Sequence, residues 1–180
     1  MKRLAKAALI VRLRDQLAEH GSWCGETHLQ KAAYFLQEGV GVPLEFDFVL
    51  YRHGPFAFDL REELVALRAE GLLSLQPQSA PYGPRLVSTP DGERLVKQFP
   101  KTVGRYEGQV RQVAGFIKGR GVSSLERIAT ALMLVREHPD SDNESLAGRM
   151  MEIKAHISYD AAMGALEEVR RFLDVVEQPV

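Results

Sequence analysis

The spacing of apolar residues in the first half of the chain predicts three helices. Leucines that recur every fourth residue predict a helix over 4–20, which a glycine ends. Apolar residues at helical spacing predict a second helix over 27–39. A third stripe begins at Leu60 and stops at Gly71, a residue that suits the position just after a helix.

Between the second and third helices, aromatic and polar residues alternate over 46–51, which predicts a strand. The strand leads into Arg52-His53-Gly54-Pro55, and the residues that follow resemble a helix start. Glycine tolerates an abrupt bend, and proline costs least just before a helix begins. The sequence therefore predicts a strand-to-helix corner at 52–55, with Arg52 and His53 projecting outward because neither side chain is easily buried.

The next segment predicts a two-stranded ribbon followed by a helix. Residues 72–76 and 85–88 are typical of strands, and a turn rich in proline, serine and glycine separates them. Thr89 is a natural N-cap, and Pro90 suits the first helical position. This order resembles a winged helix-turn-helix, whose ribbon ends in a similar Thr-Pro-x-Gly phrase, and the likeness covers 60–96.

Beyond Pro100 the pattern predicts helices to the end of the chain. They include a helix over 103–119, two helices opened by capping boxes at 123–126 and 141–144, and a last helix with an apolar stripe over 162–176. We expect a mainly α (α+β) fold in which a winged-helix-like unit with a small β-ribbon joins a C-terminal helical bundle. The chain is predicted to be a single domain over 1–180, with its winged-helix-like part over 1–98 and its helical part over 99–180.

The composition is that of an ordinary soluble globular protein. The 180 residues are 45% hydrophobic and 26% charged, and the net charge of −1 is not that of a nucleic-acid binder. The single cysteine, Cys24, excludes an intrachain disulfide and favours a cytoplasmic location. Arg12 and Arg14 interrupt the N-terminal apolar run too early for a membrane span, so no membrane partner is expected.

The charges of the predicted winged-helix unit are unfavourable for DNA. Its third helix would enter the major groove, and the exposed residues there would be Asp59, Arg61, Glu62, Glu63, Arg68 and Glu70. Four acidic residues against two basic ones repel phosphates, and the ribbon tip adds only Tyr82 and Arg85. A basic strip over 101–120 is the one segment that would suit nucleic acid or an acidic partner.

No motif for a metal, cofactor or catalytic centre stands out. Cys24 and His28 lie four residues apart, but no second pair has metal-ligand spacing, and the simpler interpretation is a half-buried thiol beside a surface histidine. The glycines lack the spacing of a phosphate-binding loop, so no cofactor is predicted. An enzyme that uses Cys24 or His53 is the least supported hypothesis, because no motif orients either residue.

Residues 27–73 carry a set of phrases that resembles a known group of proteins. They are a Leu-Gln-Lys-x-x-Tyr-Phe-x-Gln helix, a Pro-Leu turn, an aromatic strand and a Tyr-x-x-Gly-Pro-Phe corner. In these features the chain resembles the YwgA-like proteins, the SocA/Panacea phage-associated antitoxin domains and the C-terminal module of DarG-type antitoxins. The resemblance extends more weakly to 125–137 and 152–158.

This resemblance implies a helical fold with a small sheet and no established catalytic centre. Characterised members bind a partner protein, neutralising a toxin or handing it to a protease. The macrodomain of DarG-type proteins has no counterpart here, so its activity is not implied. We therefore predict a non-enzymatic protein-binding module of antitoxin or phage-defence type, and the alternative is a winged-helix DNA-binding transcriptional regulator.

The predicted partner-binding surface lies at the 52–55 corner and the helix before it. For Gln30 and Lys31, an ordinary solvated helix face is an equally supported alternative. For Tyr34 and Tyr51, packing in the core is the favoured alternative. The predicted surface comprises Gln30, Lys31, Tyr34, Tyr51, Arg52 and His53.

Overall fold

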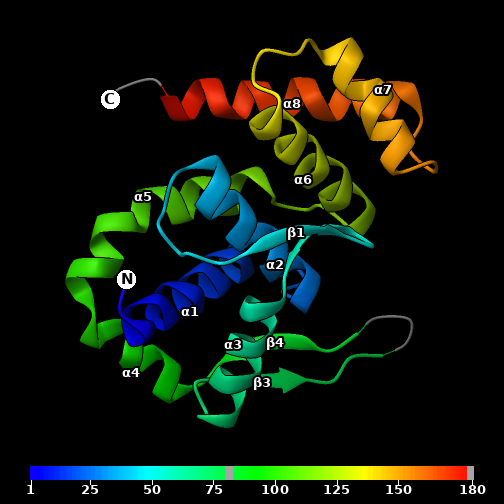
Figure 1. Ribbon diagram of the computed structural model, residues 1–180. Coiled ribbons are helices and arrows are strands. Elements are labelled where there is room, and N and C mark those ends of the chain that lie inside the picture. Colours follow the sequence, from blue (N-terminus) through cyan, green and yellow to red (C-terminus); the bar gives the residue numbers. More distant parts are fainter. Residues whose placement is uncertain (80–82, 178–180) are drawn as a thin grey trace.

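The fold, given by a computed structural model, is mainly helical with two small antiparallel sheets, which confirms the predicted fold class (Figure 1). The structure describes residues 1–79 and 83–177. The helices are α1 (Arg3–Glu19), α2 (Glu26–Tyr34) with its π-helical extension η1 (Phe35–Gly39), α3 (Phe58–Ala69), α4 (Pro90–Gln98), α5 (Pro100–Phe116), α6 (Val122–Glu137), α7 (Asn143–Ile153) and α8 (Tyr159–Glu177). The strands are β1 (Phe48–Tyr51), β2 (Gly54–Ala57), β3 (Leu73–Gln76) and β4 (Arg85–Ser88).

The predicted β3–β4 ribbon and the helix after it are confirmed. The two strands pair antiparallel from Leu73 opposite Ser88 to Gln76 opposite Arg85. Thr89 caps α4, since its hydroxyl accepts a hydrogen bond from the Gly92 N–H at 3.1 Å. The order α3, ribbon, α4 is the one on which the winged-helix likeness rests, while Tyr82 at the ribbon tip lies outside the described residues.

The predicted strand-to-helix corner is wrong, because the chain forms a β-hairpin there. β1 pairs antiparallel with β2, with Tyr51 opposite Gly54, so Arg52 and His53 form a two-residue turn. Gly54 closes the turn with a φ of +78°, a conformation that glycine adopts at little cost. Helix α3 begins only at Phe58.

One cluster of buried apolar side chains runs through both halves of the chain. Helix α1 crosses the centre of the lower part of Figure 1 and packs against α4, α5 and β4. Helix α6 packs against α8 and α2, and it also contacts the back of β2. The hairpin therefore lies between α2 and α6, and both halves of the chain support it.

Neither of the two predicted capping boxes forms at the start of its helix. Asp142 rather than Ser141 caps α7, accepting a hydrogen bond from the Ser145 N–H at 2.7 Å. Helix α6 begins at Val122 with no side-chain cap, and Glu126 instead faces His53 of the hairpin turn.

Candidate functional site: the β1–β2 hairpin

The outer face of the hairpin carries an exposed aromatic strip. Side chains alternate between the faces of a strand, so Val49, Tyr51 and Phe56 share one face. The rings of Tyr51, Phe56 and Phe58 are mutual neighbours, with centroid separations of 5.1–5.7 Å. Tyr51 and Phe58 nevertheless remain 44% and 47% exposed. Exposed aromatic residues in one patch are typical of a binding surface.

Gln30 holds the hairpin from behind. Its side chain is fully buried, its Nε2 donates a hydrogen bond to the Ala57 carbonyl at 2.9 Å, and its Oε1 accepts one from the Ala57 N–H at 3.0 Å. The expectation that Gln30 lies on a surface is therefore wrong. A strand main chain that faces a helix needs such a partner, and a glutamine amide supplies both a donor and an acceptor.

Lys31 is buried as well, which corrects its predicted place on the surface. Its ammonium donates a hydrogen bond to the Pro55 carbonyl at 2.6 Å. Burial lowers the pKa of Lys31 from 10.5 to about 8, although attraction to Glu126 opposes part of that effect. Lys31 thus stabilises the main chain of the hairpin from a buried position.

Tyr34 belongs to the core, which was the favoured alternative for this residue. It is 2% exposed and meets Phe48 edge to face, with ring centroids 5.0 Å apart. Burial raises the pKa of its hydroxyl. Tyr51, by contrast, lies at the surface and joins the aromatic strip.

Arg52 and His53 project outward at the hairpin tip, as the sequence predicted. The Arg52 guanidinium lies 5.9 Å from the centroid of the Tyr51 ring, so it extends the aromatic strip with a cation. His53 keeps 64% of its side chain exposed while its Nδ1 lies 3.7 Å from a carboxylate oxygen of Glu126.

Glu126, which sequence reasoning missed, is the centre of a polar cluster beneath the tip. It is 5% exposed, and its Oε1 lies 3.2 Å from the Lys154 ammonium in an ion pair that lacks hydrogen-bond geometry. Its Oε2 lies 3.5 Å from His156 Nε2 and also faces His53. Lys154 in turn donates hydrogen bonds to the carbonyls of Tyr51 and Arg52 at 2.9 and 2.5 Å. The tip is therefore tied to α6 and to the segment between α7 and α8.

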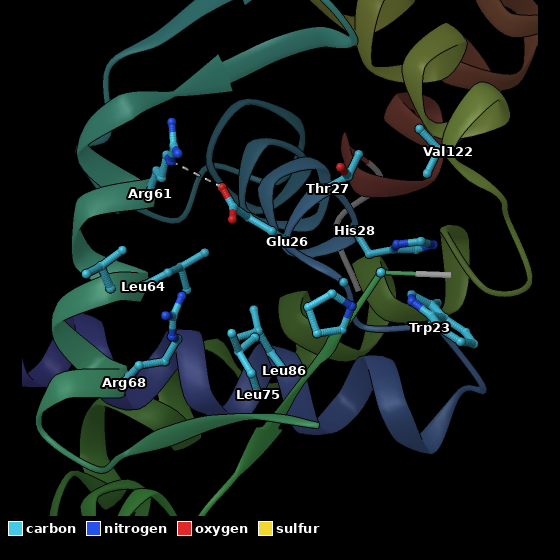
Figure 2. A pocket seen from close by; sticks show the side chains of 14 residues that line it. Trp23, Glu26, Thr27, His28, Arg61, Leu64, Arg68, Leu75, Leu86 and Val122 are labelled. Carbon is cyan, nitrogen blue, oxygen red and sulfur yellow. Dashed lines mark ion pairs between the residues drawn. The ribbon is translucent and has the colours of Figure 1, made fainter. Parts of the chain in front are cut away.

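A second concave surface lies between α3, the ribbon and the start of α2, as Figure 2 shows. This cavity of about 300 Å³ has an apolar wall that includes Leu64, Leu75 and Leu86. At its rim, Arg61 of α3 pairs with Glu26 of α2 at 3.8 Å. It offers an apolar hollow with few charges, and it contains no residue of the predicted site.

Cys24 and His28 are both more buried than expected. Burial raises the pKa of the Cys24 thiol, which disfavours the nucleophilic thiolate. His28 is 6% exposed and lies 3.2 Å through Nε2 from the Arg120 carbonyl, and burial lowers its pKa. These environments correct the predicted half-buried thiol and surface histidine.

Two further findings concern the described part of the chain, 1–79 and 83–177. Among these residues, no cluster of three or more histidine, cysteine, aspartate or glutamate side chains could hold a metal ion. Nor does any helix in these ranges combine the length and apolar character that crossing a bilayer demands.

Two comparisons with known proteins found no match. No known protein family matches the chain, and no curated protein sequence matches it significantly. The resemblance to SocA/Panacea and YwgA-like proteins therefore remains a prediction that rests on the motifs of 27–73.

Proposed function

We propose that this chain is a non-enzymatic protein-binding module of antitoxin or phage-defence type. In this proposal it acts in the cytoplasm and holds its partner, a toxin, on the outer face of the β1–β2 hairpin. The observation that carries the proposal is the exposed strip formed by Tyr51, Phe56 and Phe58, with Arg52 at its end. Tyrosine and arginine are over-represented among the residues that dominate binding energy at protein interfaces.

The support behind the strip favours binding over a merely solvated turn. Gln30, Lys31 and Lys154 fix the hairpin main chain through hydrogen bonds of 2.5–3.0 Å. A surface that is already ordered before binding loses less entropy on association. Gln30 and Lys31, two buried members of the predicted site, thus act on binding by positioning its exposed members.

The experiment tests whether the strip binds the protein encoded beside this gene, the natural candidate for a toxin. The purified neighbour is titrated against the wild type and against Tyr51→Ser and Phe58→Ser. Each change removes an anchor, and we expect at least tenfold weaker binding, as the loss of a dominant interface residue costs roughly 2 kcal/mol or more. Val175→Ser is the matched control, because Val175 is 65% exposed on α8, outside the hairpin. Equal binding by folded strip and control variants would exclude the hairpin as the binding surface.

The alternative, a DNA-binding regulator, gains little from the electrostatics of α3. Asp59, Glu62 and Glu70 are exposed on or beside this helix, and Arg61 is engaged with Glu26. Arg68 is the exposed basic residue there with no ion pair among the described residues. A major-groove helix needs the opposite balance of charge.

A further inference from the structure

The main-chain hydrogen bonds of the hairpin reveal which edge is open. Gln30 engages both the N–H and the C=O of Ala57, so these groups point away from β1. Ala57 and its opposite residue Phe48 are therefore a pair that makes no hydrogen bonds across the hairpin. Pairs of this kind alternate along a hairpin, so Leu50 and Pro55 form the next one. Two features of Pro55 agree with this: it has no N–H to donate to Leu50, and its carbonyl accepts a hydrogen bond from Lys31 instead.

It follows that Phe48 and Leu50 direct their N–H and C=O groups to the outer edge of β1. Within the described residues, no hydrogen bond reaches these four groups. The main chain on either side is engaged: Gln37 binds both groups of Phe46 at 2.9 Å, and Lys154 binds the carbonyl of Arg52. Within the hairpin, the open edge is thus confined to β1, the strand that carries Val49 and Tyr51.

Nothing in the sequence of β1 protects this edge. Natural edge strands are usually shielded by a charged residue, a proline or a covering segment. β1 reads Phe-Val-Leu-Tyr, and Val49, Leu50 and Tyr51 are 41%, 39% and 44% exposed. Because consecutive residues point to opposite faces, their exposure means that neither face is closed off over 49–51.

We propose that the edge of β1 pairs with β1 of a second copy of this chain. The two strands run antiparallel about a two-fold axis at Val49, so Phe48 of each copy lies opposite Leu50 of the other. Four new hydrogen bonds then satisfy all the open main-chain groups of both copies. Two hairpins become one four-stranded sheet.

Charge complementarity favours a second copy in this register. Beyond the paired residues, Tyr51 lies opposite Asp47 of the second copy, which brings Arg52 alongside the same carboxylate. Arg52 has no ion pair within the described part of the chain, and Asp47 forms its hydrogen bond there through its N–H rather than its carboxylate. A two-fold axis repeats this contact, so one pairing creates two such contacts.

The pairing also deepens the proposed function, on which this part rests. The axis stands perpendicular to the sheet, so the strips of both copies face the same side. Val49 lies at the axis, flanked by Tyr51 and Phe56 of each copy. The dimer therefore presents one continuous aromatic surface to a partner, in place of two short ones.

Sedimentation equilibrium of the wild type, Leu50→Pro and Leu50→Thr tests the proposal between roughly 1 and 500 μM, the range suited to a small interface. Proline removes the outward N–H of residue 50 and spares the hydrogen bonds within the hairpin, whereas threonine keeps that N–H. We expect the wild type and Leu50→Thr to dimerise with Kd values within about threefold. Leu50→Pro should raise the Kd at least tenfold. A wild type that stays monomeric throughout, or a folded Leu50→Pro that dimerises equally well, would overturn the proposal.

A charge exchange keeps the test decisive if Leu50→Pro does not fold. Arg52→Glu and Asp47→Lys should each weaken dimerisation, and the double variant should restore it. Failure of the double variant to recover any association would count against this register. Binding of the neighbouring protein separates the two proposals: if the wild type is monomeric but loses that partner through Tyr51→Ser, the pairing is wrong and the proposed function stands.

Discussion

Replacing Gly54 by alanine should destabilise the fold by disturbing the contact between the hairpin and α6. A Cβ at this position would lie 2.9 Å from Thr130 Oγ1 and 3.3 Å from the Glu126 carbonyl oxygen. The left-handed backbone at φ +78° adds strain of about 1–2 kcal/mol for a residue with a side chain. Overpacking adds about 1–3 kcal/mol, so the free energy of unfolding should fall by roughly 2–5 kcal/mol.

Gly41→Ala is the matched control for this prediction. Gly41 has a similar φ of +73°, but nothing lies within 4 Å of its added Cβ, so it reports the backbone strain alone. Urea unfolding of both variants gives the difference, provided that the m-values agree. Adding Thr130→Ala to Gly54→Ala should recover part of the loss by removing the nearer clash. If Gly54→Ala and Gly41→Ala cost the same within about 0.5 kcal/mol, α6 does not press against the turn and the reasoning fails.

Three other predictions test the core, the buried lysine and the alternative function. Leu64→Ala should lower the free energy of unfolding by about 2–5 kcal/mol, because Leu64 is 2% exposed. An unchanged midpoint in urea unfolding would contradict its burial. Because the pKa of Lys31 is about 8 when folded and 10.5 otherwise, the unfolded state binds more protons between these values. Stability should therefore rise with pH across that window, by up to roughly 3 kcal/mol, and Lys31→Met should flatten the rise; parallel curves would refute the shift. Titration with duplex DNA from its own promoter should show no affinity near 10⁻⁸ M at physiological salt, and affinity at that level would promote the regulator hypothesis.

Local sequence signals predicted the helices and the ribbon well. The leucine stripe that contains Leu64 fixed the buried face of α3, and Thr89 marked the start of α4 because capping depends on residues within one turn. The hairpin was missed because Gly54 and Pro55 fit a helix start equally well. Only the pairing of this segment with β1 decides between a helix start and a second strand.

The buried polar residues could not be predicted for a different reason. Gln30 and Lys31 bind main-chain groups 27 and 24 residues further along, and a helical pattern carries no signal of such distant partners. Glu126 is a similar case: it occupied a capping-box position in the sequence, while its ion pair is with Lys154. Of the predicted site, the exposed residues at the tip were found because their side chains resist burial.

The tie between Lys154 and the hairpin has a consequence for synthesis of the chain. Lys154 reaches the carbonyls of Tyr51 and Arg52 from 103 and 102 positions further along. A ribosome makes about 5–20 residues each second, so the aromatic strip leaves it several seconds before the side chain that secures the tip. A nascent chain thus displays these rings without their final support. The hairpin gains its full support only after synthesis has passed Lys154.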